Sequence, residues 1–317
     1  MKKKTLYKIN TSKLWNTYNY VKKYDNFKYS KEDGITYYMN SRRDAVLKYL
    51  NSLDLGKKIT ILELGYGAGQ NAKYFIKQCK KFYGIDVSAP LAKFARKKNK
   101  SSVKSGKAKF LVGSMDKKLK LTNQSIDVII IVGALQYVID PNFCMRECRR
   151  VLKKNGYLII AQSNTFQINE MIHPRKFLIN FSKFLINEHH QYSHSDTLRS
   201  LLLETKLRKY FKKFKNSWWM NSWLLKAGWN DAWKFETNRR LLSYGRLKTI
   251  LTKNKLSIYR SCSLPFFYNN KNIFTKLTFP ILDKVLILLN KIFILSFFLK
   301  FIGGANVFLC KKDGNNK

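Results

Sequence analysis

Three glycines and two carboxylates form the pattern in this chain that most suggests a chemical role. Glu63, Gly65, Gly67 and Gly69 share the string ELGYGAG, and Asp86 lies at the end of the next apolar run. A glycine loop between a strand and a helix lets the backbone approach a ligand closely. A carboxylate at the end of the neighbouring strand can accept hydrogen bonds from both hydroxyls of a ribose.

The spacing of the glycines indicates which ligand the loop would hold. The string reads G-x-G-x-G rather than G-x-G-x-x-G, which disfavours a pyrophosphate at the start of the following helix. Glu63 would repel a diphosphate, whereas its carboxylate suits a ligand with an ammonium group. The pattern therefore predicts a ligand with a ribose and an ammonium group, although a plain tight turn uses such glycines as well.

Three of the four histidines are candidates for a general base. His189, His190 and His194 follow the fifth predicted strand, in a segment that would overhang the carboxyl edge of the sheet. Histidine can take up a proton near neutral pH, although surface or core positions explain such residues equally well. Their spacing would also suit a metal, but no fourth ligand lies nearby in the sequence, so we predict no metal site.

Apolar runs and helical patterns alternate along the part of the chain that carries these residues. We expect strands at 59–65, 82–88, 109–114, 126–134 and 157–163, and helices at 41–56, 71–81, 89–98 and 141–156. The run at 126–134 is typical of a central strand that is buried on both faces. Strands that alternate with crossover helices indicate a parallel, doubly wound α/β sheet. After an interruption the pattern resumes with a helix at 240–255 and strands at 256–263 and 303–312.

The order of these motifs resembles that of class I S-adenosylmethionine-dependent methyltransferases. ELGYGAG is similar to their first motif, GIDVS to the second, and SIDVIIIVGALQYVIDP to the region of the fourth strand. FCMRECRRVLKKNGYLIIAQSN resembles the helix and strand of the branch that includes quinone-biosynthesis methyltransferases. The resemblance covers about residues 45–164, and the last two predicted strands are similar to the sixth and seventh of the family. It implies a Rossmann-like, doubly wound, mostly parallel seven-stranded sheet with helical insertions.

The resemblance also implies S-adenosylmethionine as the cofactor and a role for each matching residue. Glu63 and the three glycines would line the methionine part of the cofactor. Asp86 would hold the ribose, and Val87 would pack on the adenine. Gly133 would lie beside the cofactor at the tip of the fourth strand.

Two further groups of residues are expected near the ligands, the first from the same resemblance and the second from its position alone. Ser114 and Met115 occupy the loop that flanks the adenine edge. The family commonly has Gly-Asp in this loop where the chain has Gly-Ser, so Asp116 is the predicted substitute. Gln136 and Tyr137, just past the fourth strand, are expected near the methyl acceptor.

The chain divides into four predicted parts. Residues 1–40 form a basic and aromatic N-terminal helical cap, and residues 41–164 form the core that binds S-adenosylmethionine. Residues 165–239 form a helical insert that covers the substrate. Residues 240–317 complete the sheet, with an apolar helix at 281–302 before the last strand.

Charge and cysteine content bear on location and partners. Lys and Arg outnumber Asp and Glu by 61 to 19, which gives a net charge of +42. Such a chain attracts nucleic acid or acidic lipid, although the codon bias of a low-GC genome also produces Lys-rich proteins. No CxxC pair occurs among the five cysteines, so we expect free thiols and a cytoplasmic protein.

Two segments favour a membrane surface as the partner. Residues 206–233 interleave basic with aromatic side chains, which suits a membrane interface, single-stranded nucleic acid or simple packing on the core. Residues 281–302 have a wide apolar face with few charges, which is typical of a helix lying in the interface. Nucleic-acid binding does not need such an apolar helix, so we favour peripheral association with anionic membranes.

We therefore predict an S-adenosylmethionine-dependent methyltransferase with a lipidic or membrane-associated small-molecule acceptor. The segment after the fourth strand lacks the Asn/Asp-Pro-Pro-Tyr string of enzymes that methylate amino groups of bases. It also lacks a Pro-Cys nucleophile for attack on a pyrimidine. The alternatives are a soluble metabolite or sugar as acceptor, an RNA methyltransferase, or a non-catalytic basic adaptor for membrane or RNA.

Overall fold

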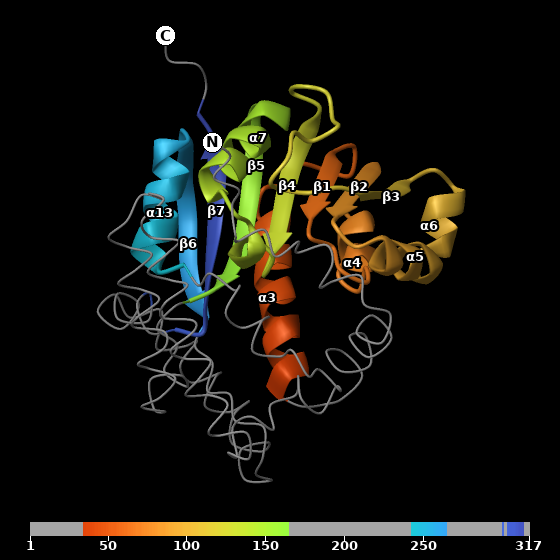
Figure 1. Ribbon diagram of the computed structural model, residues 1–317, viewed down its shortest axis with the longest axis horizontal. Helices are drawn as coiled ribbons and strands as arrows, with labels where there is room; N and C mark the ends of the chain where they lie inside the picture. The colour runs from red at the N-terminus through yellow and green to blue at the C-terminus, as the bar shows by residue number, and fades with distance from the viewer. Residues whose placement is uncertain (1–33, 165–241, 265–299, 301–302, 314–317) are drawn as a thin grey trace, which may run out of the picture.

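A seven-stranded sheet organises the residues that the computed structural model describes, which are 34–164, 242–264, 300 and 303–313 (Figure 1). The strand order is β3-β2-β1-β4-β5-β7-β6. The strands are β1 (Thr60–Leu64), β2 (Lys81–Asp86), β3 (Ala108–Val112), β4 (Ile126–Val132), β5 (Leu152–Ser163), β6 (Leu256–Leu264) and β7 (Ala305–Lys312). Within these residues β7 alone runs antiparallel to its neighbours, β5 and β6. The predicted Rossmann-like, mostly parallel seven-stranded sheet is therefore confirmed.

Helices pack on both faces of this sheet and make a three-layer fold (Figure 1). The helices are α3 (Gly34–Asn51), α4 (Ala72–Ile76), α5 (Ala89–Lys98), α6 (Lys100–Lys104), α7 (Pro141–Val151) and α13 (Tyr244–Lys253), with a short 3-10 helix η1 (Leu135–Tyr137). On one face α3 packs against β4, β5 and β7, and α4 and α5 pack near β1 to β3. On the other face lie α7 and α13.

Strand β4 lies in the middle of the sheet and is buried on both faces. Ile129 and Ile131 point into the core beneath α7, whereas Val128 and Ile130 point into the core beneath α3. All four side chains are completely buried. The continuous apolar run thus forms the predicted central strand, because a parallel strand between two helical layers has no face exposed to water.

Side-chain caps fix where the main helices begin. The Asp140 carboxylate accepts hydrogen bonds from the backbone N–H groups of Asn142 and Phe143, directly before Pro141 opens α7. Ser88 and Ser243 cap α5 and α13 in the same way. Each cap satisfies backbone donors that the first helical turn leaves without a partner.

The predicted helix at 141–156 is too long. Helix α7 ends at Val151 and β5 begins at Leu152, which pairs with Ile126 of β4. The Leu152 carbonyl also accepts a hydrogen bond from the Lys312 ammonium group at 2.6 Å. These contacts with distant strands override the helical spacing that the sequence shows. The helix expected at 71–81 ends early for a similar reason, since the N–H of Lys80 bonds to the carbonyl of Ile59.

Several predicted segments lie outside the described residues. These are nearly all of the N-terminal cap, the insert at 165–239 and almost the whole apolar helix at 281–302. Among the residues that are described, no helix is both long and apolar enough to cross a membrane.

Candidate functional site

The glycine loop follows β1 at the carboxyl edge of the sheet, and its backbone allows little other than glycine. Gly65, Gly67 and Gly69 all have positive φ, at 76°, 58° and 77°. At Gly65 there is also no room, because an added Cβ would lie 2.3 Å from the Cβ of Ala134, just past β4. The loop is therefore pressed against the segment that follows the central strand.

Asp86 holds this loop in place from the end of β2. One carboxylate oxygen accepts a hydrogen bond from the N–H of Gly67 at 2.9 Å, and the other accepts from the N–H of Ser88 at 3.0 Å. Burial raises the pKa of Asp86, and these backbone N–H groups oppose that rise. A carboxylate has further lone pairs, so Asp86 can still accept hydrogen bonds from ribose hydroxyls.

Glu63 is a buried carboxyl group beneath the loop. Its side chain is 1% exposed, and its Oε2 atom has no hydrogen-bond partner. Burial, with a smaller contribution from the charge of Asp86, raises the pKa of Glu63 to about 8. A buried acceptor of this kind is costly by itself and becomes favourable when a ligand brings a cation or a donor to it.

Arg42 is a residue of the same region that the sequence analysis missed. It lies on α3, is 4% exposed, and places its guanidinium against Gly133 at the tip of β4. Arg42 precedes the buried Val46 and Leu50 at helical spacing, so it occupies the apolar stripe of the helix. A charged residue within such a stripe is the signal that could have revealed it, because arginine is seldom buried without a specific partner.

The loop after β3 approaches the glycine loop from the other side. The Met115 methyl group would lie 3.8 Å from a Cβ added at Gly65, so Met115 packs over the loop. The Ser114 hydroxyl accepts a hydrogen bond from the N–H of Asp116. Asp116 in turn accepts hydrogen bonds from the N–H groups of Ile139 and Asp140, and so ties this loop to the segment after η1. Contact of these residues with adenine stays a prediction, as does that of the partly buried Val87.

The residues predicted near the acceptor lie on η1, next to the same edge. Gln136 is 6% exposed, and its Oε1 atom accepts a hydrogen bond from Nε2 of Gln162 at 3.0 Å. Tyr137 is partly buried. The N–H of Gly133 bonds to the carbonyl of Ala161, which joins the ends of β4 and β5.

The predicted histidines do not take part in this description, because residues 189, 190 and 194 lie outside the described part of the chain. Their role as general bases stays a prediction. All five cysteines are free thiols.

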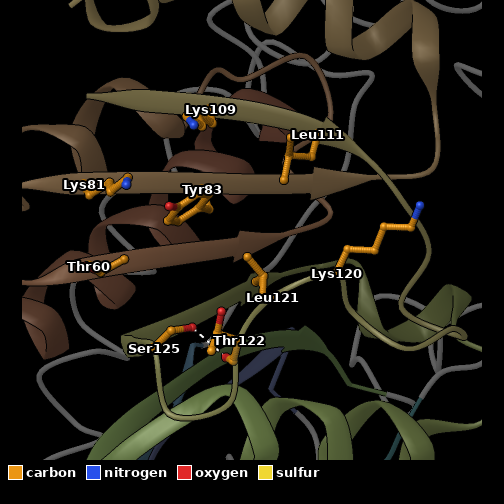
Figure 2. A pocket seen from close by; sticks show the side chains of 9 residues that line it. All are labelled: Thr60, Lys81, Tyr83, Lys109, Leu111, Lys120, Leu121, Thr122 and Ser125. Atoms are coloured by element: carbon orange, nitrogen blue, oxygen red, sulfur yellow. Dashed lines mark hydrogen bonds between the residues drawn. The ribbon is translucent and has the colours of Figure 1, made fainter. Parts of the chain in front are cut away.

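A separate hollow of about 460 Å³ opens on the sheet face that carries α7, beside β1, β2 and β3 (Figure 2). It exists because no helix stands between β3 and β4 to cover that face. The residues that line it are Thr60, Lys81, Tyr83, Lys109, Leu111, Lys120, Leu121, Thr122 and Ser125. The three lysines are exposed, and none of the residues predicted to bind the cofactor is among them.

Comparison with known sequences gives partial matches to methyltransferases. The model of a family described as a methyltransferase domain matches residues 62–160. A ubiquinone biosynthesis O-methyltransferase of Pelagibacter ubique is 31% identical over 111 residues, which are 34% of this chain and 43% of that protein. A thiol S-methyltransferase of Rattus norvegicus is 27% identical over 121 residues, which are 38% of this chain and 49% of that protein. The chain thus spans less than half the length of these curated relatives.

Solved structures match over more of the chain. One chain of a complex between the Trm112 methyltransferase activator of Haloferax volcanii and a methyltransferase has a TM-score of 0.53 and 13% identity. That match covers 95% of this chain and 97% of the other. Geranyl diphosphate C-methyltransferase from Streptomyces coelicolor has a TM-score of 0.50 and 11% identity, with coverage of 86% and 79%. At such low identity these likenesses show the fold.

The family match and the site coincide in the sheet. The match begins within β1 and ends within β5, so it contains the glycine loop, Glu63 and Asp86. A loop with a buried carboxyl on one side and a second carboxylate on the next strand suits S-adenosylmethionine, which carries an ammonium group and a ribose. The fold, the site and the family match over residues 62–160 therefore agree with a methyltransferase domain in this part of the chain, similar to those of the class I S-adenosylmethionine-dependent superfamily.

Proposed function

We propose that the protein transfers a methyl group from S-adenosylmethionine to a lipidic or membrane-associated small molecule. The observation that carries the cofactor part is Glu63, whose buried Oε2 atom has no partner beneath a loop in which three glycines have positive φ. The ammonium group of the cofactor would be that partner. Its positive charge would lower the pKa of Glu63 from about 8 and keep the carboxylate ionised.

Arg42 complements Glu63 in this proposal. The methionine part of S-adenosylmethionine carries a carboxylate as well as an ammonium group. Glu63 is a buried acid and Arg42 a buried base, and both lie at the carboxyl edge of the central strands. The two residues would bind the opposite charges of the same zwitterion, while Asp86 accepts hydrogen bonds from the ribose.

The chain itself has little covalent chemistry to perform. The bound cofactor supplies an electrophilic methyl group on a sulfonium, whose departure leaves a neutral thioether. The protein has to hold the acceptor in line and keep water away. Gln136 and Tyr137 would contact the acceptor, and one of His189, His190 and His194 would take its proton where the acceptor must lose one.

The lipidic acceptor rests on the sequence and on the name of one relative. The basic and aromatic residues at 206–233 and the apolar stretch at 281–302 suit a membrane interface. The Pelagibacter ubique relative is named for ubiquinone biosynthesis. These two observations favour a lipidic acceptor over a soluble metabolite, a sugar or RNA.

Methyl transfer from radiolabelled S-adenosylmethionine into host extract tests both parts of the proposal. After the reaction, the extract is separated into organic, nucleic-acid, protein and small-solute fractions, at moderate salt to suppress nonspecific binding of the polycation. We expect the label in the organic fraction. Label in RNA or in small solutes would contradict the lipidic acceptor. Binding of the cofactor without transfer to any fraction would favour a non-catalytic adaptor.

A further inference from the structure

A row of neutral polar side chains is buried at the carboxyl edge of β5, beyond the cofactor residues. Gln162 of β5 stands opposite Asn306 of β7, and Asn306 stands opposite Ser263 of β6. Residues directly opposite in antiparallel strands point to the same face. Gln162 and Asn306 are each 1% exposed and Ser263 is 2% exposed, so the row is as buried as the apolar core.

In each of the two side-chain amides, only one polar atom forms a hydrogen bond. Nε2 of Gln162 donates a hydrogen bond to Gln136 at 3.0 Å, but its Oε1 atom has no partner. Oδ1 of Asn306 accepts a hydrogen bond from the Ser263 hydroxyl at 2.5 Å, but its Nδ2 atom has no partner. An acceptor and a donor are thus left over on facing positions of adjacent strands. Buried polar atoms are nearly always paired, so each of these two atoms points to a missing partner.

The row is joined to the cofactor loop through η1. Gln136, which binds Gln162, stands two residues after Ala134, and the Cβ of Ala134 blocks any side chain at Gly65. A molecule bound by Gln162 and Asn306 would therefore lie on the route from the cofactor loop across the carboxyl edge of the sheet.

The chemistry of the row is neutral, and aromatic rings adjoin it. No charged side chain of the described residues hydrogen-bonds to Gln162 or Asn306. Phe308, two residues along β7 from Asn306, stacks on Tyr244 of α13 with ring centroids 4.9 Å apart. The ammonium group of Lys300 lies 5.6 Å from the centre of the Tyr244 ring, so a charge stands near the aromatic pair. The row itself is neutral and suits a polar group without charge rather than an ion.

We propose that Gln162 and Asn306 bind a neutral hydroxyl group of the methyl acceptor. The hydroxyl donates to Oε1 of Gln162 and accepts from Nδ2 of Asn306, which satisfies both atoms with one group. An ionised carboxylate cannot do this, because it has no proton to donate. The inference rests on the proposed methyltransferase function and narrows its acceptor to hydroxyl-bearing, otherwise apolar molecules.

Three matched probes test the proposal by calorimetry with the full-length protein. The probes are 4-hexylphenol, 4-hexylanisole, which lacks the donor, and 4-hexylbenzoate, which is an anion. Binding of S-adenosylhomocysteine is measured first, and failure at that step contradicts the proposed function itself. With S-adenosylhomocysteine bound, we expect the phenol to bind about tenfold or more tightly than either other probe, since an unsatisfied buried acceptor rejects the analogue without the donor.

Variants of Gln162 and Asn306 show whether these two residues cause the preference for the phenol. Gln162→Met removes the free acceptor and should bring the affinities for phenol and anisole close together, with unchanged binding of S-adenosylhomocysteine. Asn306→Leu removes the free donor of the same site, so it should weaken binding of the phenol. The matched control is Gln78→Met, which makes the same change just after α4 and should keep the preference of the wild type.

Three results would overturn the proposal while leaving the methyltransferase function intact. The first is failure of the wild type to bind 4-hexylphenol when S-adenosylhomocysteine binds normally. The second is equal or tighter binding of the anisole or the benzoate by the wild type. The third is a phenol preference that survives Gln162→Met, which would place the hydroxyl of the phenol away from the free acceptor of Gln162.

Discussion

The two halves of the carboxyl edge of the sheet differ in the polar groups that they bury. At β1 and β2 they include ionisable groups, the buried carboxyl of Glu63 and the partly buried carboxylate of Asp86, and the buried Arg42 lies against the tip of β4. At β5, β7 and β6 they are amides and hydroxyls. Burying a charge costs far more than burying an amide, so a protein keeps charges where a ligand or a fixed group compensates them. The difference is that expected between a half that binds a zwitterionic cofactor and a half that binds a neutral acceptor.

The largest loss of affinity should come from adding a side chain at Gly65 in the glycine loop. Gly65→Ala places a Cβ against Ala134 and adds strain at φ 76°, so the affinity for S-adenosylhomocysteine should fall about 100-fold or more. Calorimetry measures this loss. The control is Gly56→Ala, where φ is 63° but nothing lies within 4 Å of the added Cβ. If both variants bind S-adenosylhomocysteine equally well, the close contact with Ala134 is not the reason that glycine is needed at position 65.

The next effect concerns the charge of Glu63. In the proposed site the ammonium group of the cofactor pairs with the ionised carboxylate of Glu63, so the affinity of the wild type for S-adenosylhomocysteine should rise as pH increases from 6 and level off above about 8. Glu63→Gln should bind more weakly at pH 8.5, by about tenfold to 100-fold, and should lose this dependence on pH. A titration of affinity against pH for both proteins checks it, and parallel curves would contradict the assignment.

Without a ligand, the ionised carboxylate of Glu63 should destabilise the folded protein, although the same charge favours binding of the cofactor. The pKa of Glu63 in the folded protein is raised above its ordinary value of 4.5 to about 8, so the folded state binds the proton more tightly than the unfolded state. The stabilisation that comes from this tighter proton binding is fully present below pH 4.5 and is lost as pH rises through 8. Ligand-free Glu63→Gln should therefore unfold at a higher temperature than the wild type at pH 9, and the difference should shrink at pH 6. Thermal unfolding of both proteins at one salt concentration measures the difference.

A smaller effect is expected for Arg42. Arg42→Met should weaken binding of S-adenosylhomocysteine about tenfold, and should abolish any preference for it over an analogue without the carboxylate. Arg43→Met is a matched control on the next residue, where the guanidinium pairs with Asp44 and lies 4.3 Å from the ring centre of Tyr74. Equal losses in the two variants would mean that Arg42 supports α3 and does not bind the carboxylate.

The smallest effect should be at the hollow beside β1, β2 and β3. Replacing both Lys81 and Lys109 by alanine should leave the affinity for S-adenosylhomocysteine within about twofold, since exposed charges contribute little at a distance in salt. Calorimetry at physiological salt checks this. A larger loss would extend the cofactor site to this face of the sheet.

The sequence by itself determined the sheet, the glycine loop and the identity of Glu63 and Asp86 as its carboxylates. Strand and helix periods and the conformational needs of glycine are local properties, so they can be read from neighbouring residues. Spacing did not determine where α7 stops, because pairing of Leu152 with Ile126 ends the helix. It also could not reveal that Arg42 lies against Gly133, or that Gln162, Asn306 and Ser263 form one row. Only the tertiary structure decided these points, because burial and pairing depend on contacts between residues that are distant in the chain.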